Sequence, residues 1–158
     1  ELVNIHSHYI TDASASWTDY EVRGRMVRTE LMGGVGVTAF SDYPDADHYY
    51  RLRAYGDTPF HIAAHGTEMT SGTCTSQVQA DVNVWFRFRF QVEDRDGETV
   101  INAKLWPDGE VEPEMWQIRN CGDSSANRRT RGHFGVWSMR GPNSWDDLEV
   151  IPTAEVSR

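Results

Sequence analysis

Residues 84–92 read Val-Trp-Phe-Arg-Phe-Arg-Phe-Gln-Val, and an apolar side chain occupies every second position from Val84 onward. A β-strand places successive side chains on opposite faces of its sheet. The valines and phenylalanines therefore share one face, while the tryptophan, the two arginines and the glutamine share the other. This alternation predicts a strand with one face buried in a core.

The residues after this stretch predict a hairpin. Asp96-Gly97 is a dipeptide typical of two-residue hairpin turns. A second apolar run extends from Thr99 to Trp106, and Pro107-Asp108-Gly109 ends it. We expect the two runs to pair as antiparallel strands.

Strand patterns also dominate the rest of the chain. We expect strands at residues 20–26, 34–40, 49–55, 59–64, 132–139 and 145–151. No segment of ten or more residues has a helical period, and residues 111–118 are expected to form one short helical turn. Short strands joined by polar turns predict an all-β fold, an antiparallel two-sheet β-sandwich of the jelly-roll type. We expect one domain over residues 1–151 and a tail or linker over residues 152–158.

Composition restricts the classes of partner. The 158 residues include 15 basic and 24 acidic side chains, for a net charge of −9. Nucleic-acid binding is disfavoured, because neutralising a phosphate backbone requires a dominant basic surface. No apolar stretch approaches the roughly 20 residues of a membrane-spanning helix, so we expect no membrane insertion.

The two cysteines, Cys74 and Cys121, are 47 residues apart in polar, loop-like surroundings. This placement favours a disulfide formed in an oxidising compartment, and hence a secreted or extracellular protein. The alternative is two free thiols.

Three Arg-x-Arg pairs lie inside predicted strands, and alternation places both arginines of a pair on one face. If the three strands are neighbours, one sheet face is a cationic platform edged by aromatic rings. Such a platform can clamp carboxylate or sulfate groups and stack on sugar rings. The predicted ligand-binding residues are Arg23, Arg25, Tyr49, Arg51, Arg53, Tyr55, Trp85, Arg87, Arg89 and Trp106. The alternative is a solvated face on which the arginines pair with Glu21, Glu30, Glu93 or Glu98.

The order of several motifs carries a resemblance to a known superfamily. These motifs are Trp17-Thr-Asp-Tyr-Glu-Val, Tyr49-Tyr-Arg-Leu-Arg, the stretch at 84–89, Ala103-Lys-Leu-Trp-Pro-Asp-Gly, Glu112-Pro-Glu-Met-Trp116, Gly132-His-Phe-Gly-Val and Trp145-Asp-Asp-Leu-Glu-Val. In this order the chain resembles, over residues 15–151, the laminin-G-like jelly rolls of the concanavalin A-like lectin and glucanase superfamily. The resemblance includes bacterial modules appended to secreted carbohydrate-active enzymes. It implies a non-catalytic, lectin-like domain of a larger secreted protein that binds a polysaccharide on a concave sheet.

The resemblance also implies a structural Ca²⁺ between the last strand and the N-terminal segment. Asp146 would then be a ligand, with backbone carbonyls and Asp12 or Asp19 supplying further oxygens, which calcium prefers. The alternative is that Asp146 caps a turn or pairs with an arginine.

Two further functions stay open. A polysaccharide lyase acting on a polyuronate is suggested by Arg28-Thr-Glu-Leu31, which matches a strand of jelly-roll alginate lyases. The companion motif reads Gln117-Ile-Arg119 where those enzymes have Gln-Ile-His, so the proposed base is missing. A glycoside hydrolase is disfavoured because the superfamily pattern Glu-x-Asp-x-x-Glu is absent.

A structural or adhesion module, in which every outward arginine is matched by a carboxylate, is the other alternative. Trp116 is expected to anchor a loop.

Overall fold

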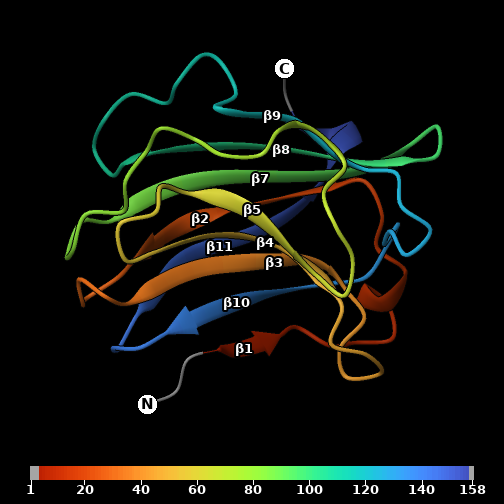
Figure 1. Cartoon of the computed structure of the whole chain (residues 1–158), viewed down its shortest axis with the longest axis horizontal. Coiled ribbons are helices and arrows are strands. Elements are labelled where there is room, and N and C mark those ends of the chain that lie inside the picture. The colour runs from red at the N-terminus through yellow and green to blue at the C-terminus, as the bar shows by residue number, and fades with distance from the viewer. Residues whose placement is uncertain (1–3, 157–158) are drawn as a thin grey trace.

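The computed structural model describes residues 4–156, which form two antiparallel sheets packed face to face (Figure 1). The five-stranded sheet has the order β1 (Ile5–His8), β10 (His133–Met139), β3 (Gly34–Ser41), β4 (Tyr49–Tyr55) and β5 (His61–His65). The six-stranded sheet has the order β11 (Ser144–Pro152), β2 (Tyr20–Val27), β7 (Phe86–Arg95), β8 (Glu98–Pro107), β9 (Ile118–Asp123) and β6 (Ser71–Thr73). The predicted two-sheet jelly-roll sandwich is confirmed.

The core lies between the sheets and is built from the alternating apolar positions. The phenylalanines of β7 and Val92 are almost completely buried, and they meet Val35, Val37 and Leu52 of the opposite sheet in one hydrophobic cluster. The outer residues of β7 are only partly covered. The apolar residues of β7 therefore face the core and its polar residues face outward, as the alternation predicted.

The hairpin after β7 has the predicted two-residue turn. Arg95 pairs with Glu98 in the register, and Asp96 and Gly97 both have positive φ, 46° and 90°. Two consecutive positive φ angles give a turn whose twist matches that of the flanking strands.

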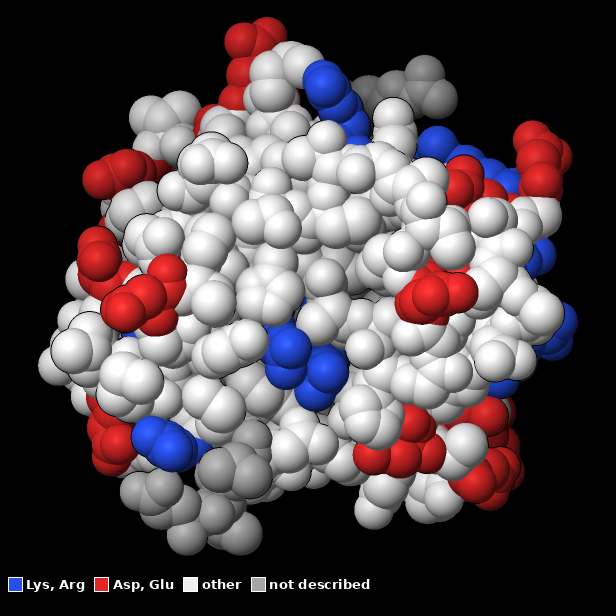
Figure 2. Space-filling model, viewed as in Figure 1, with Lys and Arg blue, Asp and Glu red and all other residues white. Residues whose placement is uncertain are grey.

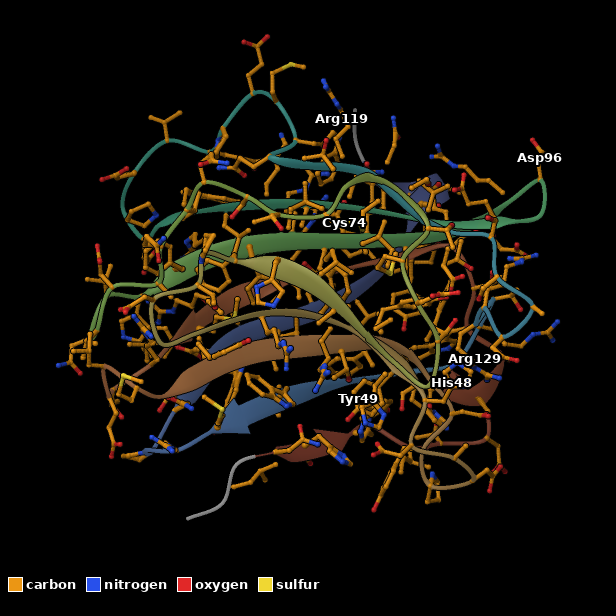
Figure 3. All side chains as sticks on the ribbon, viewed as in Figure 1. His48, Tyr49, Cys74, Asp96, Arg119 and Arg129 are labelled. Atoms are coloured by element: carbon orange, nitrogen blue, oxygen red, sulfur yellow. A yellow bond between two sulfur atoms is a disulfide. The ribbon has the colours of Figure 1, made fainter. Side chains whose placement is uncertain are left out.

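The predicted disulfide is present between Cys74 and Cys121, whose Cα atoms are 4.9 Å apart. Cys74 directly follows β6, and Cys121 lies in β9, the only strand with which β6 pairs in the described part of the chain. The bridge (Cys74 is labelled in Figure 3) therefore holds the short edge strand of the six-stranded sheet.

Several boundaries differ from the sequence-based expectation. The predicted helical turn at 111–118 is wrong, because residues 111–117 have no regular structure and Ile118 begins β9. Residues 152–156 belong to the fold: Pro152 ends β11, and a 3₁₀ helix, η2 (Thr153–Glu155), follows. The Thr153 amide donates to the Asp19 carbonyl at 2.7 Å. The remaining tail residues, 157 and 158, lie outside the described residues.

The N-terminal segment also contains a short 3₁₀ helix, η1 (Ser14–Ser16), between β1 and β2. Within residues 4–156 there is no helix with the length and apolar character that crossing a membrane requires.

Candidate functional site

The three Arg-x-Arg pairs lie on two different sheets. β2 and β7 are neighbours, so Arg23 stands opposite Arg89 and Arg25 opposite Arg87. β4, which carries the third pair, belongs to the five-stranded sheet. The single platform expected from the sequence is therefore wrong. Its predicted members divide into Arg23, Arg25, Trp85, Arg87, Arg89 and Trp106 on one outer face and Tyr49, Arg51, Arg53 and Tyr55 on the other.

On the six-stranded sheet, one buried carboxylate joins two of the arginines. Glu21 has no exposed surface and accepts hydrogen bonds from Arg23 and, at 2.6 Å, from Arg89. Arg89 also donates to Glu112 at 2.8 Å, and Lys104 donates to the same carboxylate at 2.9 Å. The hydrogen bond that Arg89 donates to Glu21, together with the one it donates to Glu112, raises the pKa of Arg89 against the opposing effect of burial.

The other two arginines of this sheet share a second acidic group. Arg25 and Arg87 donate to Asp108 at 2.8 and 2.5 Å, and Arg25 also donates to Asp146 at 2.6 Å. These hydrogen bonds lower the pKa values of Asp108 and Asp146. The guanidinium of Arg25 also lies 4.9 Å from the ring of Trp85. The four arginines of the two Arg-x-Arg pairs on β2 and β7 are thus neutralised by carboxylates of the same face.

On the five-stranded sheet, Arg51 and Arg53 have no such partner. Arg51 donates to the side-chain oxygen of Asn4 at 3.3 Å, and Arg53 donates to Nε2 of His61 at 3.4 Å. Across residues 4–156, neither guanidinium forms an ion pair with a carboxylate. Among the described residues, these two guanidinium groups therefore lack the direct carboxylate contacts that the arginine pairs of β2 and β7 have.

Aromatic rings surround both guanidinium groups. Arg51 lies 5.6 Å from the ring of Tyr49 and 5.7 Å from that of Trp137. Arg53 lies 4.9 Å from the ring of Tyr55 and 5.2 Å from that of Trp137. A cation over an aromatic ring is attracted by the negative face of that ring. These contacts orient the two guanidinium groups but do not neutralise their positive charge.

The position of Trp137 depends on glycines in the neighbouring strand. In the register, Gly36 of β3 stands between Trp137 of β10 and Arg53 of β4. A Cβ added at Gly34 would lie 2.9 Å from the indole. Glycine at these positions lets the indole lie over β3, where it is 1% exposed and reaches both arginines. Trp137 was not among the site residues predicted from the sequence, and the alternating glycines at 34 and 36 are the signal that could have indicated it.

Burial changes the electrostatics of this arginine pair. Arg51 is 7% exposed, and burial lowers its pKa, with the charge of Arg53 lowering it further. Burial also lowers the pKa of Arg53. Arginine nevertheless stays protonated in proteins. Figure 2 shows a small group of basic atoms near the centre of this face, with acidic side chains towards its periphery.

A cluster of histidine and tyrosine rings adjoins the arginines at the end of the sheet where Tyr49 is labelled in Figure 3. His8 stacks on Tyr43 with ring centroids 5.0 Å apart, and Tyr49 stacks on His65 at 5.3 Å. Burial, together with the charge of His6, lowers the pKa of His8 to about 4. The imidazole of His8 is therefore uncharged around neutral pH.

The described residues do not fit the predicted calcium site. Asp146 accepts hydrogen bonds from Arg25 and from the Asp147 amide, and Asp19 accepts one from the Asp94 amide at 2.8 Å. Asp12 lies in an exposed turn before η1. No three acidic, histidine or cysteine side chains within residues 4–156 form a group that could hold a metal ion. Calcium binding by Asp146 stays a prediction, while the alternative pairing with an arginine is observed.

The lyase motif does not lie on a strand. β2 ends at Val27, and Arg28-Thr-Glu-Leu31 follows it as a loop. The guanidinium of Arg28 is buried and donates to the carbonyls of Leu31 and Gly56, at 3.1 and 2.8 Å. This arginine therefore ties a loop to the sandwich instead of facing a substrate cleft.

Comparison with solved structures places the chain among jelly-roll domains of known architecture. It is similar to the carbohydrate-binding module CBM66 from Bacillus subtilis, with a TM-score of 0.57 and 12% identity over 94% of this chain and 96% of that module. It is also similar to the catalytic domain of a GH131 β-glucanase from Podospora anserina, with a TM-score of 0.52 and 11% identity over 94% of this chain and 64% of that domain. The sequence matches no family model and no curated protein. At these identities the likeness concerns the fold, and the laminin-G-like subtype stays a prediction.

Proposed function

We propose that this chain is a non-catalytic carbohydrate-binding domain that holds an acidic or sulfated glycan on the outer face of its five-stranded sheet. The observation that carries the proposal is the contrast between the arginine pairs. In the described residues, the arginines of β2 and β7 have carboxylate partners, whereas Arg51 and Arg53 have none. The fold likeness to a carbohydrate-binding module supports the same class of function.

An anionic group would relieve an unfavourable charge arrangement at β4. Two positive charges two residues apart on a strand are separated by about 7 Å, and they repel by roughly 2 kcal/mol at an effective dielectric constant of about 20. A carboxylate or sulfate in front of Arg53 offsets this repulsion and accepts the paired N–H groups of the guanidinium. Arg51, which is more deeply buried, would act mainly through its charge.

The neighbouring rings supply contacts for the sugar itself. Tyr55 and His61 are half-buried beside Arg53, with their ring centroids 5.8 Å apart. Rings of this kind present an apolar face and a polar edge, which suits a sugar ring with its alternating C–H and hydroxyl surfaces. Because Arg53 also contacts Tyr55, the charged and apolar contacts lie within reach of one sugar unit.

The test compares Arg53→Ala with Arg23→Ala by titration calorimetry against a polyuronate, a sulfated polysaccharide and neutral polysaccharides. Both variants lose one positive charge, but Arg23 lies on the opposite face and pairs with Glu21. We expect Arg53→Ala to weaken acidic-glycan binding at least tenfold, about 1.4 kcal/mol, and Arg23→Ala to leave it unchanged. Equal affinities for the wild type and Arg53→Ala, with both folded, would reject the proposal. Ultraviolet absorbance from an unsaturated product would instead identify a lyase.

A structural or adhesion module is the second candidate, and the six-stranded sheet favours it. The arginines of β2 and β7 in that sheet are all paired with carboxylates, as a solvated structural face requires. If the wild-type chain binds none of the glycans, this candidate replaces the first.

We further propose that the domain works outside the cell as part of a larger secreted protein. The Cys74–Cys121 disulfide supports this location, because disulfides persist in oxidising compartments and are rare in the cytosol.

A further inference from the structure

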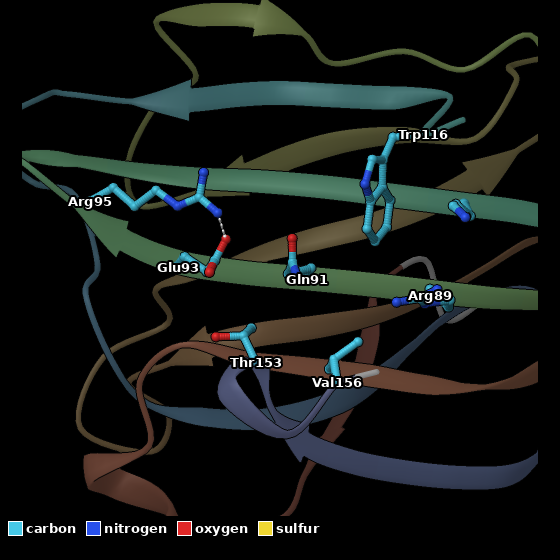
Figure 4. A pocket seen from close by; sticks show the side chains of 8 residues that line it. Arg89, Gln91, Glu93, Arg95, Trp116, Thr153 and Val156 are labelled. Atoms are coloured by element: carbon cyan, nitrogen blue, oxygen red, sulfur yellow. Dashed lines mark hydrogen bonds and ion pairs between the residues drawn. The ribbon is translucent and has the colours of Figure 1, made fainter. Parts of the chain in front are cut away.

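A cavity lies on the opposite side of the molecule from Arg53. It has a volume of about 370 Å³ and lies on the outer face of the six-stranded sheet, between β7, β8 and the residues after β11 (Figure 4). Trp116 stands at one side of this cavity, the Arg95–Glu93 pair stands at the other, and Gln91 lies between them. The remaining lining residues are Arg89, Lys104, Thr153 and Val156.

Trp116 is held in place by side chains of β7 and β8 against its ring and by the hydrogen bonds of the residue that follows it. Arg89 and Lys104 lie 5.2 and 5.3 Å from its ring, and in Figure 4 Arg89 and Gln91 are on different sides of the indole. The next residue, Gln117, accepts a hydrogen bond from the Leu105 amide at 2.9 Å and donates to the Leu105 carbonyl at 2.8 Å. The indole is therefore fixed before any ligand arrives, which reduces the entropy lost on binding.

Polar groups with unused hydrogen-bonding capacity surround the aromatic wall. The side-chain oxygen of Gln91 accepts from Asn102 at 3.1 Å, which leaves its amide N–H groups directed elsewhere. Within residues 4–156, Arg95 pairs only with Glu93, so further donors and acceptors of that pair remain available. Thr153 adds a hydroxyl at the lower edge of the cavity in Figure 4.

The charges in this cavity compensate one another. Arg89 pairs with Glu21 and Glu112, Lys104 pairs with Glu112, and Arg95 pairs with Glu93. Adding an anion would compete with carboxylates that are already in place, so the cavity does not favour a charged ligand. An uncharged ligand with one apolar face and several hydroxyl groups fits both the indole and the free polar groups.

We propose that this cavity is a second glycan site, which takes one neutral sugar ring stacked on Trp116 with its hydroxyl groups bonded to Gln91, the Glu93–Arg95 pair and Thr153. This inference goes beyond the acidic-glycan site at Arg53, since it uses other residues on the other sheet. Together the two sites would let one domain contact two glycan chains, or a neutral and an acidic segment of a mixed polysaccharide.

The experiment follows the indole N–H resonance of Trp116 by two-dimensional NMR during titration with soluble neutral xylo-, cello-, laminari- and fructo-oligosaccharides. We expect at least one of these probes to shift that resonance in a saturable manner. Trp116→Ala should weaken binding of that probe at least tenfold. The matched control is Trp85→Ala, which removes a tryptophan of the same face that contacts Arg25 and does not line the cavity.

Gln91→Ala serves as a second variant if Trp116→Ala does not fold, and it should weaken the same probe. Acidic-glycan binding should be unchanged in both variants, so failure of this site and failure of the Arg53 site give different results. The inference is overturned if no neutral oligosaccharide shifts the Trp116 resonance, or if both cavity variants bind the probe as tightly as the wild type.

Discussion

Arg53 and Arg89 belong to the same sequence pattern and have different chemical surroundings. Arg89 donates to two carboxylates, whereas Arg53 reaches a histidine nitrogen and two aromatic rings. A guanidinium matches a carboxylate through paired N–H groups. Arg89 already uses this capacity within the fold, while Arg53 does not use it with any carboxylate of the described residues, which is why we propose it as the ligand contact.

Sequence alternation could predict that these arginines point outward, but not their partners. The carboxylates that neutralise the β7 arginines come mostly from Asp108 and Glu112, which follow β8 in a loop. The position of a loop depends on the whole fold, so residue spacing along a strand carries no information about it. The acidic partners that were predicted correctly, Glu21 and Asp146, are both strand residues.

His8 gives the folded protein a pH-dependent stability. Its pKa is about 4, below its ordinary 6.5, because burial and nearby histidines disfavour the charged form. The unfolded chain therefore binds a proton between these values while the folded chain does not. The stability that neutral His8 contributes is complete above pH 6.5 and is lost as the pH falls towards 4.

We expect His8→Gln to reduce the loss of stability in that pH window, measured by urea denaturation at several pH values. Ser7→Gln, at the adjacent exposed position of β1, controls for a change in the strand itself. An unchanged pH slope in His8→Gln would show that other groups carry the dependence.

At the scale of elements, one row of residues crosses the whole five-stranded sheet. The register aligns His6, Trp137, Gly36, Arg53 and His61 from β1 to β5. The candidate acidic-glycan site is therefore a property of strand pairing: a shift of one residue in β3 would place a valine under the indole.

Gly36→Ala should disturb this row. A Cβ at position 36 would lie 2.5 Å from the Leu52 carbonyl oxygen and 2.8 Å from the Cβ of Arg53, so β3 and β4 must move apart. We expect a loss of about 1–3 kcal/mol in the free energy of unfolding, together with weaker acidic-glycan binding.

Gly97→Ala is the comparison variant for that experiment. Its added methyl group meets nothing within 4 Å, and its cost comes from the positive φ of 90° alone. We expect it to lose stability without losing glycan affinity. If Gly36→Ala binds acidic glycans normally, the site does not depend on the spacing of β3 and β4.

The strands themselves were largely predictable, whereas their assignment to sheets was not. Period-2 patterns identified β2, β4 and β7, and continuous apolar runs identified β3 and β8, which are buried along almost their whole length. β4 lies in the sheet opposite β2 and β7 because of the strands with which it pairs. The side-chain period of a single strand does not show which strands are its neighbours. Short strands such as β1 and β6 were missed because three or four residues carry too little pattern.

At the scale of the molecule, the two outer faces differ in how their charge is compensated. The chain has a net charge of −9, yet within residues 4–156 the arginines of β4 form no ion pair while those of β2 and β7 are neutralised. The proposed acidic ligand would therefore approach against the net charge and bind at one local position. Its selectivity would then follow from the geometry of that position and not from overall electrostatic attraction.

The pairing of Asp146 with Arg25 leads to a prediction about calcium. Because this carboxylate is engaged by Arg25, and the described residues contain no group of three acidic, histidine or cysteine side chains that could hold a metal ion, we expect an excess of EDTA to leave the midpoint of thermal unfolding unchanged. The measurement compares melting curves in EDTA and in calcium chloride. A higher midpoint in calcium would contradict this and restore the predicted ligand role of Asp146.

The outermost strands of both sheets have a consequence for self-association. β1 has 4 residues and β6 has 3, while β11 contains a bulge between Asp146 and Glu149. β5 is the last strand of the five-stranded sheet, and His61 on its outer edge forms an isolated antiparallel bridge with Thr75. Long, flat outer strands recruit further copies of a chain by backbone hydrogen bonding, and short or bulged ones do not. Crowded copies of this sandwich on a polysaccharide surface should therefore remain individual molecules, without growing into fibrils.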